Sequence, residues 1–260
     1  MKDQVPGQVA AAEQARFAEI GENLAAVRER IAAACAAAGR SAKEVELVAV
    51  SKFRPATDVL HLLRLGQQVF GENRDQEASA KAAQVADTFA GNFTDTPSDP
   101  RPEWHFIGQL QTNKARSVVS YADVVESVDR LPLVLALQKA ADRAERTIRC
   151  FVQVNLDAEA ARDGSGRGGA HPAEVLEIAD AVAGSAALRL SGLMAVAPLG
   201  APPEPAFERL AALAGQLRGI HPDAVSLSAG MSGDLEAAVA AGATHVRIGS
   251  ALLGSRPMLR

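Results

Sequence analysis

The sequence predicts an α/β fold, a single TIM-type (β/α)8 barrel with an additional long helix before it. The first observation is that short apolar runs rich in β-branched residues alternate with stretches of helical periodicity, and that eight such runs occur. The second is their spacing, because residues 45–254 leave about 26 residues for each of eight units, close to the ~31 of a typical ~250-residue barrel. The composition, 48% apolar and 22% charged, is that of a globular chain with a sizeable core.

The first predicted element is a helix within residues 1–39. Apolar residues recur there at alternating steps of three and four, which places them on one stripe that ends at Gly39. The stripe consists of Phe17, Ile20, Leu24, Val27, Ile31, Ala34 and Ala38. Because it covers only about three heptads, we expect the helix to pack on the barrel rather than form a coiled coil. A docking surface for a partner protein is a further hypothesis for this helix.

The barrel is predicted over residues 45–254. Its strands are expected at residues 45–51, 69–71, 104–108, 124–128, 150–155, 188–196, 225–228 and 245–249. Helical periodicity separates several of them, at residues 57–65, 131–144, 173–182, 207–217 and 235–241. This alternation implies parallel strands with right-handed crossovers, and eight units favour a closed barrel over an open doubly wound sheet. We therefore expect residues 1–260 to form a single domain.

Two segments interrupt the alternation. Residues 87–102 contain many turn formers and three prolines, and residues 158–169 are rich in glycine. Both are predicted to be mobile loops. The second follows the fifth strand, at the end where barrels carry their active sites, so it is a candidate lid or a solvated spacer.

Composition also argues against several classes of function. A net charge of −4 and an aromatic content of 4% give little to attract or stack nucleic acid. No segment is typical of a signal peptide or a membrane span, and Cys35 and Cys150 are expected to be buried thiols, so we expect a cytoplasmic protein. The five histidines show no metal-ligand spacing, and no metal site is predicted.

Lys52 is the most suggestive single residue. It follows the first strand, where a buried strand reaches the C-terminal mouth of a barrel. Partial desolvation there lowers the pKa of an amine and frees it to condense with a carbonyl as a Schiff base. The alternative is a lysine that only marks where the strand reaches the surface.

Glycines and hydroxyls follow the last two strands. Gly230 and Ser232 come after the seventh strand, with Ser232 as the expected N-cap of the next helix, and Gly249 and Ser250 come after the eighth. Barrels often bind phosphate with these two loops. The pattern predicts a phosphate site, and two ordinary glycine turns are the alternative.

Arg247 is predicted to face the barrel interior, because it alternates along its strand with two neighbours on the same face. A buried guanidinium needs a partner, which would be a core carboxylate such as Glu72 or Glu126, or an acceptor on a bound ligand. Polar residues such as Asn73 and Thr112 also follow the second and third strands. They either line the mouth of the barrel or cap helices.

Taken together, several motifs resemble the pyridoxal-phosphate homeostasis protein family. The motifs are Val50-Ser51-Lys52, Phe70-Gly71-Glu72-Asn73, residues 104–108 with 111–114, Gly192-Leu193-Met194, Gly230-Met231-Ser232 and residues 246–249. The resemblance implies a barrel of the alanine-racemase N-terminal type that binds pyridoxal 5′-phosphate (PLP) and has no established catalytic reaction. It implies six cofactor-binding residues: Lys52, Asn73, Ser232, Arg247, Gly249 and Ser250.

The resemblance also implies roles for these residues. Lys52 would hold the PLP aldehyde as a Schiff base, the phosphate would lie against Ser232, Gly249 and Ser250, and Arg247 would face the pyridine nitrogen. A permanently charged donor there discourages protonation of the ring and weakens its action as an electron sink. We therefore expect a carrier or regulator of PLP without established catalysis. A small PLP-dependent amino-acid racemase is the alternative.

Other expectations come from the same family. Related racemases complete their site with a second domain and a tyrosine from the partner subunit, whereas the one tyrosine here, Tyr121, precedes the fourth strand. The implied partners are PLP and apo-enzymes that need it, and the protein is expected to be a monomer or weak dimer. The sequence departs from the family pattern at Ala229, at Asp75 and in a longer loop at residues 162–169. None of these departures involves Lys52.

Overall fold

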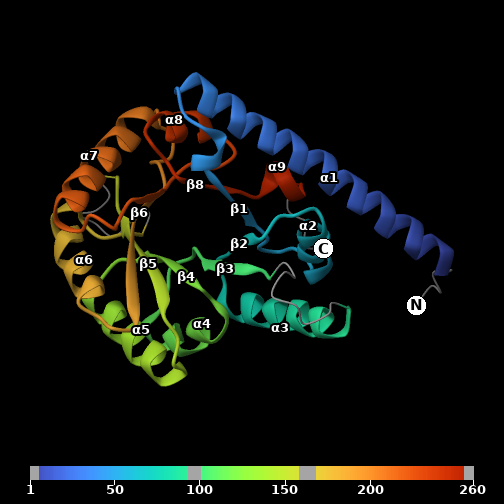
Figure 1. Ribbon diagram of the computed structural model, residues 1–260, viewed down its shortest axis with the longest axis horizontal. Coiled ribbons are helices and arrows are strands. Elements are labelled where there is room, and N and C mark those ends of the chain that lie inside the picture. Colours follow the sequence, from blue (N-terminus) through green and yellow to red (C-terminus); the bar gives the residue numbers. More distant parts are fainter. Residues whose placement is uncertain (1–5, 93–100, 158–167, 255–260) are drawn as a thin grey trace.

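The computed structural model describes residues 6–92, 101–157 and 168–254, and it confirms the predicted barrel (Figure 1). Eight parallel strands close on themselves in sequence order, so that β1 pairs with both β2 and β8. The strands are β1 (Glu46–Val50), β2 (Val69–Glu72), β3 (Glu103–Phe106), β4 (Val124–Val128), β5 (Ile148–Val154), β6 (Leu188–Ala195), β7 (Ser226–Ser228) and β8 (His245–Ile248).

Helices surround the strands as an outer ring (Figure 1). The described α-helices are α1 (Pro6–Ala37), α2 (Ala56–Arg64), α3 (Asp75–Asn92), α4 (Ala115–Tyr121), α5 (Leu131–Ala144), α6 (Val175–Ala183), α7 (Glu204–Ile220), α8 (Leu235–Ala240) and α9 (Ser250–Leu253). Short 3-10 turns, η1 (Ala42–Glu44), η2 (Thr112–Lys114) and η4 (Pro172–Glu174), precede β1, α4 and α6. None of the helices in the described ranges is long and apolar enough to cross a membrane.

The predicted loop at residues 87–102 is wrong in its first part. Residues 87–92 complete α3, which runs without interruption from Asp75 to Asn92 and is anchored on the barrel by the buried side chains of Ala82 and Val85. The prolines that suggested a loop lie further along, at residues 97–102, and do not interrupt the helix. Of the predicted loop at residues 158–169, only Gly168 and Gly169 lie within the described residues.

The long helix α1 lies across the outside of the barrel, and its N-terminal turns extend past the ring of helices (Figure 1). The predicted stripe faces inward, since Ile20, Leu24, Val27 and Ile31 are buried in one cluster with side chains of α2, α8 and α9. The prediction that this helix packs on the barrel is therefore confirmed.

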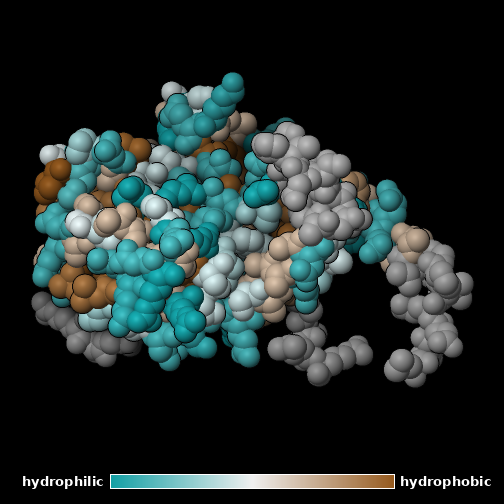
Figure 2. All heavy atoms as spheres, turned by 60° about the horizontal axis from the view of Figure 1, so that its bottom comes forward, coloured by the Kyte–Doolittle hydropathy of each residue, from teal (hydrophilic) through white to brown (hydrophobic). Residues whose placement is uncertain are grey.

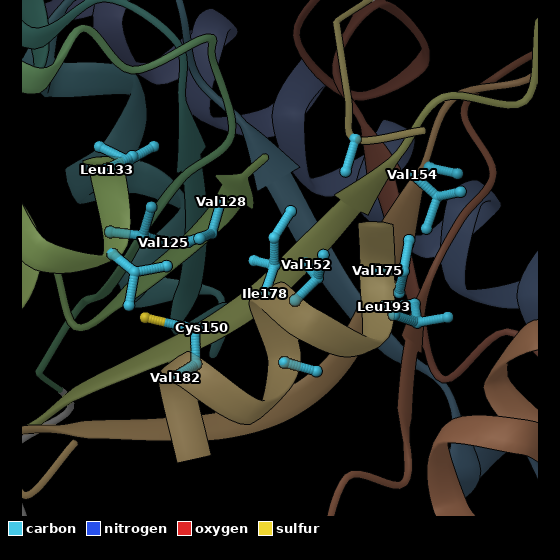
Figure 3. Packing of buried hydrophobic residues seen from close by; sticks show 14 of the residues in the cluster. Val125, Val128, Leu133, Cys150, Val152, Val154, Val175, Ile178, Val182 and Leu193 are labelled. Carbon is cyan, nitrogen blue, oxygen red and sulfur yellow. The ribbon is translucent and has the colours of Figure 1, made fainter. Parts of the chain in front are cut away.

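The main core lies between the strands and the outer helices. Figure 3 shows side chains of β4, β5 and β6 lying against those of α5 and α6, with Cys150 among them. Cys35 and Cys150 are both buried free thiols, as predicted, and burial raises the pKa of Cys150 to about 12. The face in Figure 2 is mainly hydrophilic, with apolar side chains in small separate patches.

Gly192 permits the close approach of β6 and β7. It pairs with Ser226 across these strands and has a φ of +151°, a region that disfavours side chains. A Cβ atom added here would lie 1.8 Å from the carbonyl oxygen of Ser226. The barrel therefore needs glycine at this position.

We expect Gly192→Ala to lower the free energy of unfolding by at least ~2 kcal/mol, measured by urea unfolding, because the strands must separate or the backbone must shift. Gly219→Ala is the matched control. Gly219 lies in α7 with no atom within 4 Å of an added Cβ, so this variant should stay within ~1 kcal/mol of the wild type or gain stability. Equal stabilities of the two variants would contradict the role given to Gly192.

Candidate functional site

A cavity of about 340 Å³ opens at the C-terminal ends of β1 and β8, within the range of ~300–1,000 Å³ found for small-molecule sites. It brings together five of the six residues predicted from the sequence. These are Lys52, Ser232, Arg247, Gly249 and Ser250. The remaining wall comes mainly from Val50, Phe53, Ile107 and Met231.

Asn73 does not line this cavity. It lies at the end of β2 in a separate depression with Arg74, Gln109 and Gln111, at the same end of the barrel. Its Oδ1 atom is buried and has no hydrogen-bond partner within the described part of the chain. The structure therefore does not place Asn73 with the other five residues, and its predicted part in binding remains a prediction.

The backbone on both sides of Lys52 is held by a buried ion network. Ser51 is fully buried, and its Oγ donates to Glu72 Oε1 at 2.7 Å. Phe53 has a left-handed φ of +63°, and its backbone N–H donates to Glu77 Oε1. Such a conformation costs of the order of 1 kcal/mol and persists where neighbours impose it. Lys52 itself is half-buried between these two fixed residues.

Lys81 is at the centre of this network and was not predicted from the sequence. Its buried ammonium donates to the carbonyl oxygen of Ser51 at 2.6 Å and to Glu77 Oε1 at 3.1 Å, and it also bonds Glu72. Burial raises the pKa of Glu72, and the charge of Lys81 opposes this rise. The sequence signal was the spacing of four between Glu77 and Lys81, which is common in solvent-exposed helices and so points to no site by itself.

Arg247 lines the cavity and has the core partners that one of its two hypotheses required, while its contact with a ligand remains a prediction. Its Nη1 donates to Ser228 Oγ at 2.6 Å and its Nη2 to the carbonyl oxygen of Ala195 at 2.7 Å. Nη1 also lies 3.8 Å from Glu126 Oε2, so Glu126 and not Glu72 is its core carboxylate. Arg247 is 4% exposed and yet contributes to the cavity wall, where it can also meet a ligand.

Below Arg247, a line of polar side chains continues through the barrel to its opposite end. We call it the interior column, and it consists of Arg247, Ser228, Glu126, His105, Glu103 and Arg149. Ser228 Oγ donates to Glu126 Oε2 at 2.6 Å. The two nitrogens of His105 lie 2.6 Å from Glu126 Oε1 and 2.7 Å from Glu103 Oε1, and Glu103 pairs with Arg149 at 2.6 Å.

The ionisation of the interior column follows from these contacts. Burial disfavours the imidazolium of His105, but its hydrogen bonds to Glu103 and Glu126 outweigh burial and raise its pKa. Burial alone would raise the pKa of Glu126. The hydrogen bond and charge of His105, with the charge of Arg247, instead hold it well below its usual range. Alternating charges in direct contact are the arrangement in which buried ions are stable.

The loop after β7 differs from its prediction in one respect. Ser232 is not the N-cap of the next helix, because α8 begins at Leu235 and Asp234 takes the cap position. The Asp234 carboxylate accepts a hydrogen bond from the backbone N–H of Met231 at 2.6 Å, which closes a turn before the helix. Ser232 is thereby left at the cavity, where its Oγ lies 3.4 Å from that of Ser250.

Helix α1 holds the loop after β7 and helix α9, which follows β8, from outside the barrel. Arg30 donates to the carbonyl oxygen of Ser232 at 2.7 Å and forms a bidentate pair with Glu236. Asn23 and Arg16 donate to the carbonyl oxygens of Leu252 and Leu253, each at 3.1 Å. The apolar stripe predicted that α1 packs on the barrel. The polar contacts show that it also holds the chain after β7 and β8.

Comparison with known proteins places this barrel in a class. The family model described as "Alanine racemase, N-terminal domain" matches residues 22–257. The pyridoxal phosphate homeostasis protein of Mycobacterium leprae is 44% identical over 245 residues, 92% of this chain and 93% of that protein. The protein of the same name from Escherichia coli K12 is 37% identical over 245 residues, 92% and 97% of the two chains.

Solved structures agree with this assignment. PipY of Synechococcus elongatus with PLP bound is 33% identical, with a TM-score of 0.74 over 90% of this chain and 100% of that chain. An alanine racemase from Corynebacterium glutamicum, 17% identical with a TM-score of 0.61, shares the fold over 94% of this chain and 64% of its own. The chain thus belongs to the alanine racemase N-terminal domain family and, within it, to the pyridoxal phosphate homeostasis proteins.

The raised pKa of His105 predicts a pH dependence of stability. The contribution of His105 to the free energy of unfolding is fully present below its pKa in the unfolded chain, about 6.5. It is lost as the pH rises through its higher pKa in the folded protein. We would measure the free energy of unfolding in urea at a series of pH values. As the pH rises above about 6.5, the wild type should lose stability relative to His105→Gln. Parallel pH profiles would show that His105 is not held as the imidazolium.

Proposed function

We propose that this chain binds PLP in the cavity between β1 and β8 and acts in PLP homeostasis as a carrier or regulator of the free cofactor. The observation that carries the proposal is that one cavity holds an amine, a buried guanidinium and two serine-bearing loops. The PLP-bound relative PipY, whose whole length matches this chain, supports the proposal. The names of the curated relatives support the homeostatic role.

The donor set of the cavity fits the chemistry of this cofactor. PLP supplies an aldehyde that condenses with a lysine amine as a Schiff base, and Lys52 is the lysine that lines the cavity. Ser232 and Ser250, which line the same cavity, offer hydroxyls to a phosphate. Gly249 lets the chain leave β8 close against β1, since a Cβ there would lie 3.2 Å from the carbonyl oxygen of Val50.

Arg247 gives the site its chemical character. A guanidinium donates hydrogen bonds and does not accept a proton, so it suits an unprotonated ring nitrogen. A ring kept in that form withdraws electrons weakly, which disfavours the removal of an α-hydrogen from an amino acid. This favours storage and delivery of the cofactor over racemisation. Tyr121, the one tyrosine, lies on α4 away from the residues that line the cavity.

The cellular context belongs to the same proposal. We infer that the recipients are apo-enzymes that need PLP, that the protein is a monomer or weak dimer, and that it works in the cytoplasm. Two buried, unpaired cysteines are typical of a reducing compartment and support that location. Asn73, with its buried Oδ1 atom at the same barrel end, is proposed as an accessory residue of the site.

Borohydride reduction followed by peptide mapping tests the role of Lys52. In the wild type incubated with PLP, we expect the label on Lys52 and a visible absorption band of a Schiff base. Lys52→Ala should lose both, whereas Lys114→Ala, which changes another lysine at the barrel mouth outside the cavity, should keep both. A band that survives in Lys52→Ala would exclude this lysine. Solvent deuterium entering amino acids at the α-carbon, above the level of Lys52→Ala, would favour the racemase.

A second prediction concerns the loop with Ser232, which is proposed to hold the phosphate and is supported by α1. Arg30→Gln removes the bond to the Ser232 carbonyl and the ion pair with Glu236, so we expect a loss of affinity for PLP of about fivefold and little change for pyridoxal, which lacks the phosphate. A typical net hydrogen bond contributes about 1 kcal/mol, which corresponds to roughly this factor. Arg28→Gln is the control, because Arg28 lies on the same helix and bonds Gly66 instead. Equal losses for PLP and pyridoxal would contradict a phosphate-specific effect.

A further inference from the structure

The interior of this barrel carries charges where barrels usually carry branched aliphatic side chains. His105 is 1% exposed and Glu126 is not exposed at all. An apolar cluster of Val124, Phe151 and Met194 fills part of the remaining interior. Well-packed apolar residues would stabilise a barrel at least as well as buried ion pairs do. Packing alone therefore does not account for these charged residues.

Neighbours in the interior column alternate in charge from one end of the barrel to the other. Arg149 at the end opposite the cavity pairs with Glu103, Glu103 with His105, and His105 with Glu126. Ser228 then connects Glu126 to Arg247, since its hydroxyl accepts from the guanidinium and donates to the carboxylate. Each group in this line therefore constrains the position of the next.

We propose that Ser228, Glu126 and His105 are positioning residues for the cofactor, which fix the guanidinium of Arg247 where it meets the ring nitrogen. This inference rests on the proposed function, which gives Arg247 its ligand. An arginine side chain has roughly 2 kcal/mol of rotamer entropy, so a guanidinium without fixed contacts makes a poor donor to a single acceptor. Ser228 and Ala195 each bind one of its terminal nitrogens and leave other N–H donors of the five for the cavity.

The charge of His105 adds a second effect. As the imidazolium it gives the column an excess of positive charge below a cavity that is proposed to hold an anionic ligand. The charged and titratable groups around His105 are Glu46, Glu103, Glu126 and His245, with Arg149 beyond Glu103 and Arg247 beyond Glu126. Burial lowers the pKa of His245 to about 4, so this neighbour is neutral and adds no charge. Affinity for PLP should therefore fall when His105 loses its proton.

The decisive variant is Ser228→Ala, because it removes the bridging hydroxyl and leaves every charge in place. We would measure its affinity for PLP and for 1-deaza-PLP, in which a CH group replaces the ring nitrogen. The wild type should prefer PLP, and Ser228→Ala should reduce that preference by about fivefold or more, the size of an ordinary coupling between sites. Ser226→Ala, two residues earlier on the same strand, should keep the wild-type preference.

His105→Gln provides a second variant with a different readout. Its affinity for PLP should lack the pH-dependent step that distinguishes the wild type, while circular dichroism shows that it is folded. Glu126→Gln keeps the shape of the side chain, removes its charge, and should also reduce the preference for PLP over the deaza compound. These two variants test the proposal if Ser228→Ala does not fold.

Failure of the inference and failure of the proposed function give different results. If the wild type binds PLP on Lys52 but Ser228→Ala, Glu126→Gln and His105→Gln all keep the wild-type preference and pH profile, the positioning role is wrong and the proposed function stands. If the wild type binds no PLP, both are wrong. In that case nitrogen-15 NMR of the cofactor-free protein would still report whether His105 is the imidazolium held in the column.

Discussion

The cofactor end of this barrel depends on the pairing of buried charges. An ion without its partner in the interior costs several kcal/mol, so a residue such as Glu126 or Lys81 fixes the position of the groups around it. Lys81 joins α3 to the end of β1, and Glu126 joins β4 to β3 through His105 and to β7 through Ser228. The ion pairs that keep these buried charges stable therefore also determine where Lys52 and Arg247 lie.

Two kinds of support thus converge on one cavity. Lys52 is positioned through the backbone of its neighbours Ser51 and Phe53, whereas Arg247 is held through its own side chain, which fixes a donor. The loops with Ser232 and Ser250 are held from outside the barrel by α1. Lys52, Arg247 and the two serine-bearing loops are thus held by separate sets of contacts around one cavity.

Much of this arrangement could be predicted from the sequence, and the exceptions share a cause. Alternating patterns predicted the barrel, and position at strand ends predicted Lys52, Gly249 and Ser250. The pattern also indicated that Arg247 faces inward, but its partner depended on the register between β7 and β8, which one sequence does not contain. Lys81, the cap at Asp234 and the separation of Asn73 from the cavity likewise depend on how elements meet in space.

The contacts of α1 with the chain after β7 and β8 have a consequence for which substitutions the fold tolerates. Arg30, Asn23 and Arg16 of α1 bind the main-chain carbonyls of Ser232, Leu252 and Leu253, and Arg40, just after α1, binds those of Val239 and Ala243. Every residue carries such a carbonyl, so these contacts do not depend on which side chain stands at the position contacted. The side chains at the contacted positions of α8 and α9 can therefore change without loss of these bonds, whereas Glu236 pairs with Arg30 through its own side chain and cannot.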